Sequence, residues 1–167
     1  MAPAGSKRVA DAAPDGYTMV LGTVGTHAQG QTLYKRSLYN AVTDFTAVAL
    51  LAEVPIVLLT RKDLPAKDFR EFVTYAKANH AKMQYGSAGP GAASHLACVF
   101  LNDVIGTNMT HVPYRGTGPA IRDLVAGCID VLCQAVTAAK GQIDGGAVKA
   151  LAVLDAQRSP ARSRPVA

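Results

Sequence analysis

Residues 85–96 of the chain read Tyr85-Gly86-Ser87-Ala88-Gly89-Pro90-Gly91-Ala92-Ala93-Ser94-His95-Leu96. This stretch joins a short apolar strand pattern to a glycine-rich turn and then to a helical pattern. Glycine lets the backbone turn sharply and lie close to a ligand, and the first N–H groups of a helix have no partner within the helix. The stretch therefore predicts a strand–turn–helix unit whose turn binds an anion, such as a phosphate or a carboxylate.

The spacing of the glycines argues against a nucleotide as that anion. Gly86, Gly89 and Gly91 form the pattern G-x-x-G-x-G, whereas dinucleotide folds use G-x-G-x-x-G, and no Lys-Ser or Lys-Thr pair follows Gly91 as a P-loop would require. A strand-to-helix connection with ordinary turn glycines explains this segment equally well when it is taken alone.

The composition indicates a globular chain of one-domain length. It has 167 residues, of which 49% are hydrophobic and 17% charged, so a buried core can form. The net charge of +5 does not predict a nucleic-acid partner, because the basic residues are scattered and not gathered on one helical face. Several of them lie near the ends of the chain, at Lys7, Arg8, Arg158, Arg162 and Arg164.

The cysteines predict neither a metal site nor a disulfide framework. Cys98, Cys128 and Cys133 are odd in number, lack C-x-x-C spacing and sit among apolar neighbours, so we expect small buried hydrophobic residues. No cofactor motif is present. No apolar run reaches membrane-spanning length, and residues 1–7 lack the apolar stretch of a signal peptide.

Short apolar runs alternate with helical patterns along the chain, which predicts an α/β fold built from parallel β-α-β units. A helix through Leu33 and Tyr34 is expected, and Phe69, Phe72 and Ala76 share one face of another. The remaining helices are expected at 92–105 and 119–126, and the strands at 18–21, 45–51, 55–59, 82–85, 108–112, 129–132 and 148–154.

Ligands of α/β sheets bind beyond the carboxyl ends of the strands, so the loops there are the candidate site. Three loops stand out, at 22–27, 86–95 and 114–117, and they supply hydroxyls, backbone donors and a cation instead of a carboxylate pair. Arg115 is placed to bind a carboxylate, or else is a solvated surface residue. Tyr114 is a hydrogen-bond donor, a lid or part of a core edge.

An enzyme is the competing interpretation. It would act on an acyl or phosphoryl substrate, with Ser87 or a cysteine as nucleophile and a nearby histidine as base. Ser94 and His95 cannot form that pair, because neighbours on a helix point in different directions. We expect His95 to cap or pack and His111 to be a strand residue bonded by its neighbours. A remnant without any ligand is a third possibility.

Seven motifs in one order resemble the tripartite tricarboxylate transporter receptors, also called the TctC or Bug family. The resemblance covers nearly the whole chain, and the motifs lie at 12–18, 25–27, 33–35, 44–45, 85–89, 94–96 and 111–116. It implies a two-lobed Venus-flytrap fold of the type II periplasmic binding proteins and a periplasmic location. It also implies a receptor without catalysis that binds a small carboxylate, namely a di- or tricarboxylate, an acidic amino acid or an aromatic acid.

The resemblance assigns site residues position by position. Ser87, Ala88 and Gly89 would form the anion cradle of the second lobe, and Thr26 and His27 would face them from the first lobe. The implied ligand-binding set comprises Thr26, His27, Ser87, Ala88, Gly89, Gly91, Ser94, Tyr114 and Arg115. The family usually has Ser or Thr where Ala92 stands, so one hydroxyl at the helix start is missing here.

The resemblance also predicts an incomplete fold, truncated at both ends. Residues 1–53 would form part of the first lobe, 54–154 a nearly complete second lobe, and 155–167 a crossover toward the first. Lobe closure would hinge near 50–55 and near Leu154. Self-association through the incomplete lobe is expected, and a complete parent protein would contact membrane transporter subunits.

Overall fold

The computed structural model describes residues 2–29 and 37–154, and the chain divides into two compact units, 1–52 and 53–167. Each unit has its own architecture.

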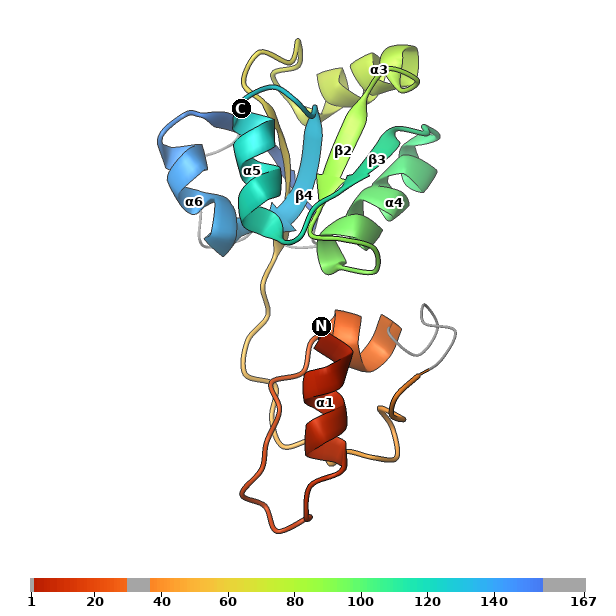
Figure 1. Ribbon diagram of the computed structural model, residues 1–167. Helices are drawn as coiled ribbons and strands as arrows, with labels where there is room; N and C mark the ends of the chain where they lie inside the picture. Colours follow the sequence, from red (N-terminus) through yellow and green to blue (C-terminus); the bar gives the residue numbers. More distant parts are fainter. Residues whose placement is uncertain (1, 30–36, 155–167) are drawn as a thin grey trace. The chain divides into compact units, whose positions relative to one another are not determined.

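Unit 53–167 is built on one mixed five-stranded sheet in the order β3-β2-β4-β1-β5 (Figure 1). Strand β2 runs parallel to both β3 and β4, whereas β1 is antiparallel to both β4 and β5. The strands are β1 (Ile56–Arg61), β2 (Gln84–Ser87), β3 (Thr110–Pro113), β4 (Val131–Ala135) and β5 (Val148–Val153).

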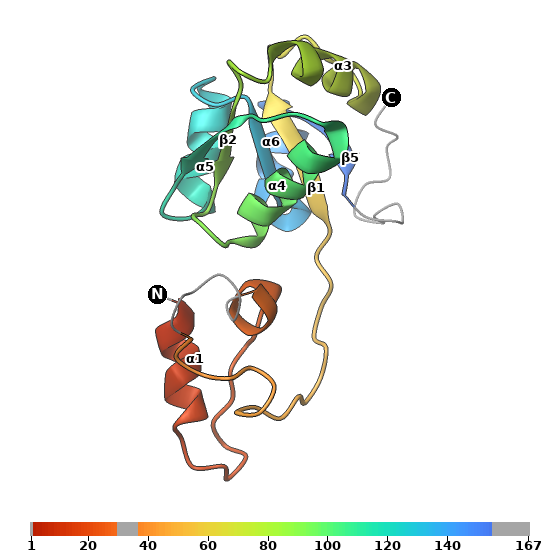
Figure 2. The ribbon, with the colours of Figure 1, turned by 90° about the vertical axis from the view of Figure 1, so that its right-hand side faces the viewer.

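Helices cover both faces of this sheet, so the unit has three layers (Figure 2). One hydrophobic cluster joins one face to α3 and α4, and a second joins the opposite face to α5 and α6. Strand β1 supplies both, because Leu58 enters the first cluster while Val57 and Leu59 enter the second. The helices are α3 (Phe69–Asn79), α4 (Ala93–Ile105), α5 (Thr117–Val125) and α6 (Val136–Asp144).

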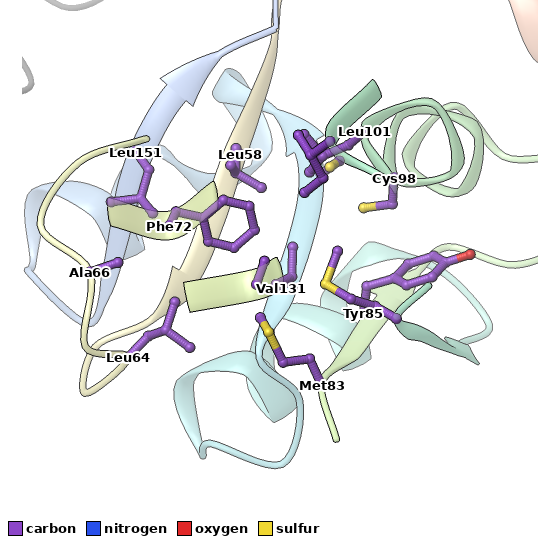
Figure 3. Close-up of a cluster of buried hydrophobic side chains, with 14 residues drawn as sticks. Leu58, Leu64, Ala66, Phe72, Met83, Tyr85, Cys98, Leu101, Val131 and Leu151 are labelled. Atoms are coloured by element: carbon purple, nitrogen blue, oxygen red, sulfur yellow. The ribbon is translucent and has the colours of Figure 1, made fainter. Parts of the chain in front are cut away.

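Local sequence signals account for the helix ends. Asp68 caps α3 by accepting a 2.8 Å hydrogen bond from the N–H of Glu71. Helix α3 then buries Phe72 and Ala76 in the first cluster, where Figure 3 shows Phe72 beside Leu58. Helix α4 ends at Gly106, whose φ of 69° is a left-handed conformation that glycine adopts readily.

The α/β class is confirmed, and so are the predicted helix start near residue 92 and its stop at Gly106. Four details differ. Cys98 and Cys133 are buried as expected, but Cys128 is exposed. The strand predicted at 82–85 lies two residues later, at Gln84–Ser87. Helix α6 (Val136–Asp144) was not among the predicted helices. The sheet is parallel only around β2, because β1 pairs with its neighbours in the antiparallel direction.

Unit 1–52 contains α1 (Ala2–Ala10) and one π-helical turn, η1 (Gly25–Gln29). Strands were predicted at 18–21 and 45–51, and neither prediction is correct for the described residues. A strand forms only when it pairs, and no described segment of this unit pairs with these two. Most of their apolar side chains are consequently exposed, with Met19 at 72% and Leu50 at 79%, whereas Val20 and Phe45 are half-buried. The helix predicted through Leu33 and Tyr34 lies outside the described residues.

None of the helices in the described part of the chain is long and apolar enough to cross a membrane.

Candidate functional site

The parallel strands β2 and β3 end side by side and bring two loops together. Ser87 pairs with Pro113 at the ends of the strands, and the N–H of Tyr114 donates to the carbonyl oxygen of Ser87 at 3.0 Å. Gly89 lies directly against the second loop, because a Cβ atom at this position would be 3.3 Å from the carbonyl oxygen of Tyr114. Loops 88–92 and 114–116 thus form one continuous edge.

Side chains hold the first of these loops in shape. The N–H of Ala88 donates to Ser94 Oγ at 3.0 Å, and the N–H of Gly89 donates to Ser87 Oγ at 3.1 Å. The N–H of Gly91 donates to Nδ1 of His95 at 3.2 Å. Three of the amides that sequence reasoning assigned to an anion therefore already have partners within the chain.

The backbone N–H groups without an acceptor lie just after this loop, at the start of α4. Its N-cap residue, Ala92, has extended backbone geometry and makes no side-chain capping bond. Among the described residues, none accepts a hydrogen bond from the N–H of Ala93 or Ser94. These two N–H groups stand at the positive end of a 13-residue helix dipole, so they suit a negatively charged group.

Beneath the loop, two histidines and a tyrosine form a stack. The rings of His95 and His111 have centroids 4.2 Å apart, and Tyr85 stacks on His111 at 4.9 Å. Nε2 of His111 lies 2.6 Å from Ser87 Oγ. Burial lowers the pKa of His95, and burial followed by the charge of His95 lowers the pKa of His111, so both rings are neutral at pH 7. They shape the loop and do not act as cations.

In the second loop, the side chain of Tyr114 is held by a hydrogen bond and that of Arg115 is exposed. The hydroxyl of Tyr114 donates to Oδ2 of Asp123 on α5 at 2.7 Å, and burial together with this bond raises the pKa of Tyr114 to about 12. Tyr114 therefore anchors its loop to α5. Arg115 is exposed, and no described carboxylate forms an ion pair with it.

Thr26 and His27 belong to unit 1–52, where they take part in local packing. Thr26 Oγ1 lies 2.8 Å from Nδ1 of His27, and the hydroxyl of Tyr39 donates to the carbonyl oxygen of Thr26 at 2.7 Å. The His27 ring meets Phe45 edge-on, with centroids 4.8 Å apart. That these two residues face Ser87 across a ligand stays a prediction.

The donors of this edge are the N–H groups of Ala93 and Ser94 and the exposed side chain of Arg115. The carboxylate of Asp123 accepts the hydroxyl of Tyr114, and the hydroxyls of Ser87 and Ser94 accept amides of the first loop. No group of three or more His, Cys, Asp or Glu side chains among the described residues could hold a metal ion. The fold is a three-layer α/β unit in which the ends of β2 and β3 carry these two loops.

Comparison with known proteins places the unit in a family. The model of the tripartite tricarboxylate transporter family receptor, TctC, matches residues 3–164. A UPF0065 protein from the TAR-I ttuE-ttuC' intergenic region of Agrobacterium vitis is 42% identical over 149 residues, which is 89% of this chain and 43% of that protein. The chain belongs to the tripartite tricarboxylate transporter receptor family.

Solved structures agree with this assignment. MatC of Rhodopseudomonas palustris with bound malate is 39% identical, with a TM-score of 0.82 over 95% of this chain and 54% of MatC. The periplasmic binding protein BugD is 37% identical, with a TM-score of 0.84 over 95% of this chain and 52% of BugD. Rpa4515 of R. palustris with adipate is 33% identical, with a TM-score of 0.86 over 93% of this chain and 52% of Rpa4515.

The chain spans about half the length of the curated relatives and solved structures that it matches.

Proposed function

We propose that this chain is part of an extracytoplasmic receptor that binds a small carboxylate for a tripartite tricarboxylate transporter, without catalysis. The observation that carries the proposal is the pair of unpartnered N–H groups of Ala93 and Ser94 at the start of α4. Together with the exposed Arg115, which lies in the loop after β3, these donors suit the oxygens of a carboxylate. Periplasmic location follows the family and BugD.

The site residues then fall into two roles. The N–H groups of Ala93 and Ser94 and the guanidinium of Arg115 contact the carboxylate, while Ser87 and His95 hold the loop in its shape. Ala88, Gly89 and Gly91 form the wall of the site, and Tyr114 fixes the neighbouring loop. Thr26 and His27 of unit 1–52 are the further ligand-binding residues that the family resemblance implies.

A dicarboxylate is the favoured ligand class. Malate in MatC and adipate in Rpa4515 are both linear dicarboxylates of different length. One carboxylate of the ligand would bind at the start of α4, and the second would bind to other residues. Transfer of the ligand to membrane transporter subunits is proposed for the complete receptor only.

The first experiment is calorimetric titration of the 167-residue chain with malate, succinate, adipate and citrate, and with butanol as an uncharged control. We expect heat from at least one carboxylate and none from butanol. Arg115→Gln should weaken binding about tenfold or more, because a charge-assisted hydrogen bond contributes roughly 1.5–3 kcal/mol. Arg122→Gln makes the same charge change at another exposed site and should leave the affinity within twofold. Equal losses in both variants would mean that only net charge matters.

The helix donors can be tested one at a time. Ala93→Pro deletes one N–H at the first helical position, where proline is tolerated, and Ala92 before it already has a suitable φ of −70° and ψ of 155°. Binding should fall about tenfold with little loss of thermal stability. Ala93→Ser keeps the N–H and should bind like the wild type. If Ala93→Pro binds normally, the carboxylate does not use this donor.

One observation favours the enzyme alternative, namely the 2.6 Å contact between Ser87 Oγ and His111 Nε2. Two others disfavour it. Ser87 is fully buried, and its Oγ also accepts the N–H of Gly89. We therefore expect no labelling of Ser87 by a fluorophosphonate probe and no esterase activity above that of Ser87→Ala. Labelling that disappears in Ser87→Ala would establish a nucleophile instead.

Self-association is the remaining expectation. Unit 1–52 exposes apolar side chains along 17–21 and 48–51, and such surface favours association in water. Light scattering coupled to size exclusion should show a mass above that of the monomer that falls on dilution. Leu21→Glu and Leu50→Glu should restore the monomer.

A further inference from the structure

The loop before α4 is held by a side chain that titrates. The N–H of Gly91 donates to Nδ1 of His95 at 3.2 Å. Nδ1 accepts this bond through its lone pair, so the bond exists only while the His95 ring is neutral and carries its proton on Nε2. The shape of loop 88–92 therefore depends on whether His95 carries a charge.

Two other rings pack against His95. His111 on β3 stacks on it with centroids 4.2 Å apart, and the ring of Tyr85 on β2 lies 4.9 Å from His111 and 6.4 Å from His95. Burial lowers the pKa of both histidines, and the charge of His95 lowers the pKa of His111 further. The pair therefore takes up its first proton on His95, and that proton opposes a second one.

The surroundings offer little to balance a charge on this pair. The titratable or charged residues that neighbouring elements bring to this region are Tyr85 on β2, Cys98 on α4, Cys133 on β4 and Arg115 in the loop after β3. Burial raises the pKa of Tyr85 and of Cys133, so both stay neutral at acid pH. No described Asp, Glu, Lys or Arg side chain forms an ion pair or a hydrogen bond with either histidine ring.

We propose that His95 is a positioning residue that makes carboxylate binding depend on pH, an inference that rests on the proposed function. Once His95 is protonated, its Nδ1–H faces the N–H of Gly91, and two donors repel each other. Loop 88–92 loses this bond, and the donors of Ala93 and Ser94 begin directly after that loop. The affinity for a carboxylate therefore falls when His95 becomes protonated.

A protonated ring also attracts an anion, which acts in the opposite direction. We expect this attraction to be the weaker effect. The ring is half-buried and its Nδ1 is directed at Gly91, whereas Ala93, beside which the carboxylate would bind, is exposed, and water screens charges there.

The loop can be followed without any ligand. In the ligand-free 167-residue chain, NMR records the amide signal of Gly91 and the imidazole signals of His95 between pH 7.5 and 5. We expect the Gly91 signal to shift with the same midpoint as the titration of His95. A Gly91 signal that stays in place while His95 titrates, or a His95 ring that stays neutral at pH 5, would overturn the proposal.

The effect on binding is measured by calorimetric titration with malate, succinate and adipate at pH 7.5 and 5. His95→Gln is the test variant, because its side-chain oxygen can still accept the Gly91 N–H but does not titrate. Protonation of the ligand itself changes the affinity to the same extent in every variant. Beyond that shared change, we expect the wild type to lose about fivefold in affinity at pH 5, which is the size of one neutral hydrogen bond.

His80→Gln is the matched control, because it removes a half-buried histidine at the end of α3. It should keep the pH dependence of the wild type. Equal pH dependence in the wild type and in His95→Gln, or tighter wild-type binding at pH 5, would contradict the proposal. If none of the three carboxylates binds at pH 7.5, the proposed function fails, and the NMR result for the loop is unaffected.

Discussion

Residues 53–154 and residues 2–52 both contain short apolar runs, but among the described residues only the runs of the first region form strands. In the first region the run Ile56–Arg61 becomes β1, between two partner strands and under helices on both faces. In the second region the run at 45–51 has no described partner strand, and Leu50 is 79% exposed. The comparison shows that an apolar extended pattern becomes a strand only where the fold provides neighbours for its backbone and its side chains.

The largest contrast is expected from equivalent truncations in the two regions. Phe72→Ala removes a fully buried ring from the first cluster and should destabilise unit 53–167 by about 3–5 kcal/mol. Leu50→Ala removes an exposed side chain and should change stability by less than about 0.5 kcal/mol. Urea unfolding followed by circular dichroism measures both. A cost of several kcal/mol for Leu50→Ala would mean that residues 1–52 bury this side chain in solution.

Replacing a glycine by alanine should lower the stability of the first region and raise that of the second. A Cβ at Gly86 in β2 would lie 2.5 Å from Cδ1 of the buried Ile129, so Gly86→Ala should destabilise by about 1–3 kcal/mol. A Cβ at Gly5, inside α1, meets nothing within 4 Å, so Gly5→Ala should stabilise that helix by about 0.5–1 kcal/mol. Thermal unfolding of both variants measures the two changes in stability. If Gly86→Ala has the stability of the wild type, the Ile129 side chain has room to move.

A smaller effect is expected at the loop anchor of unit 53–167. Tyr114→Phe deletes the bond to Asp123 and should cost about 0.5–1.5 kcal/mol. Because the pKa of Tyr114 is raised to about 12, its contribution persists below pH 10 and is lost as the pH rises through 12. The phenolate absorbance of the wild type minus that of Tyr114→Phe should show a single titration near pH 12. Asp123→Asn should move that titration to lower pH.

The smallest effect is expected at acid pH, in the stack beneath the candidate site. Burial lowers the pKa of both His95 and His111 below the usual 6.5, so the unfolded chain binds more protons than the folded one under acid conditions. Stability contributed by the neutral rings is present above pH 6.5 and declines as the pH falls below it. Melting temperatures at pH 7.5 and 5 should differ, and the double variant His95→Gln with His111→Gln should reduce that difference.

The sequence predicted the parts of the site that depend on neighbours along the chain. The strand, the glycine turn and the helix start at residues 85–96 follow from local propensities, and the structure places them as expected apart from a small shift of β2. It could not predict the bond between His111 and Ser87, because that contact depends on how β2 and β3 align. The capture of the Gly91 N–H by His95 also depends on a side-chain orientation that periodicity does not specify.

The sequence by itself determined the α/β class and the helix stop at Gly106, because propensity and turn chemistry act over short stretches of chain, and it determined the family through the order of its motifs. Tertiary structure alone decided the antiparallel direction of β1, the contact between His111 and Ser87, and the hydrogen bond between Tyr39 and Thr26. These features join residues far apart in the chain, and their energies exist only once the folded segments have come together.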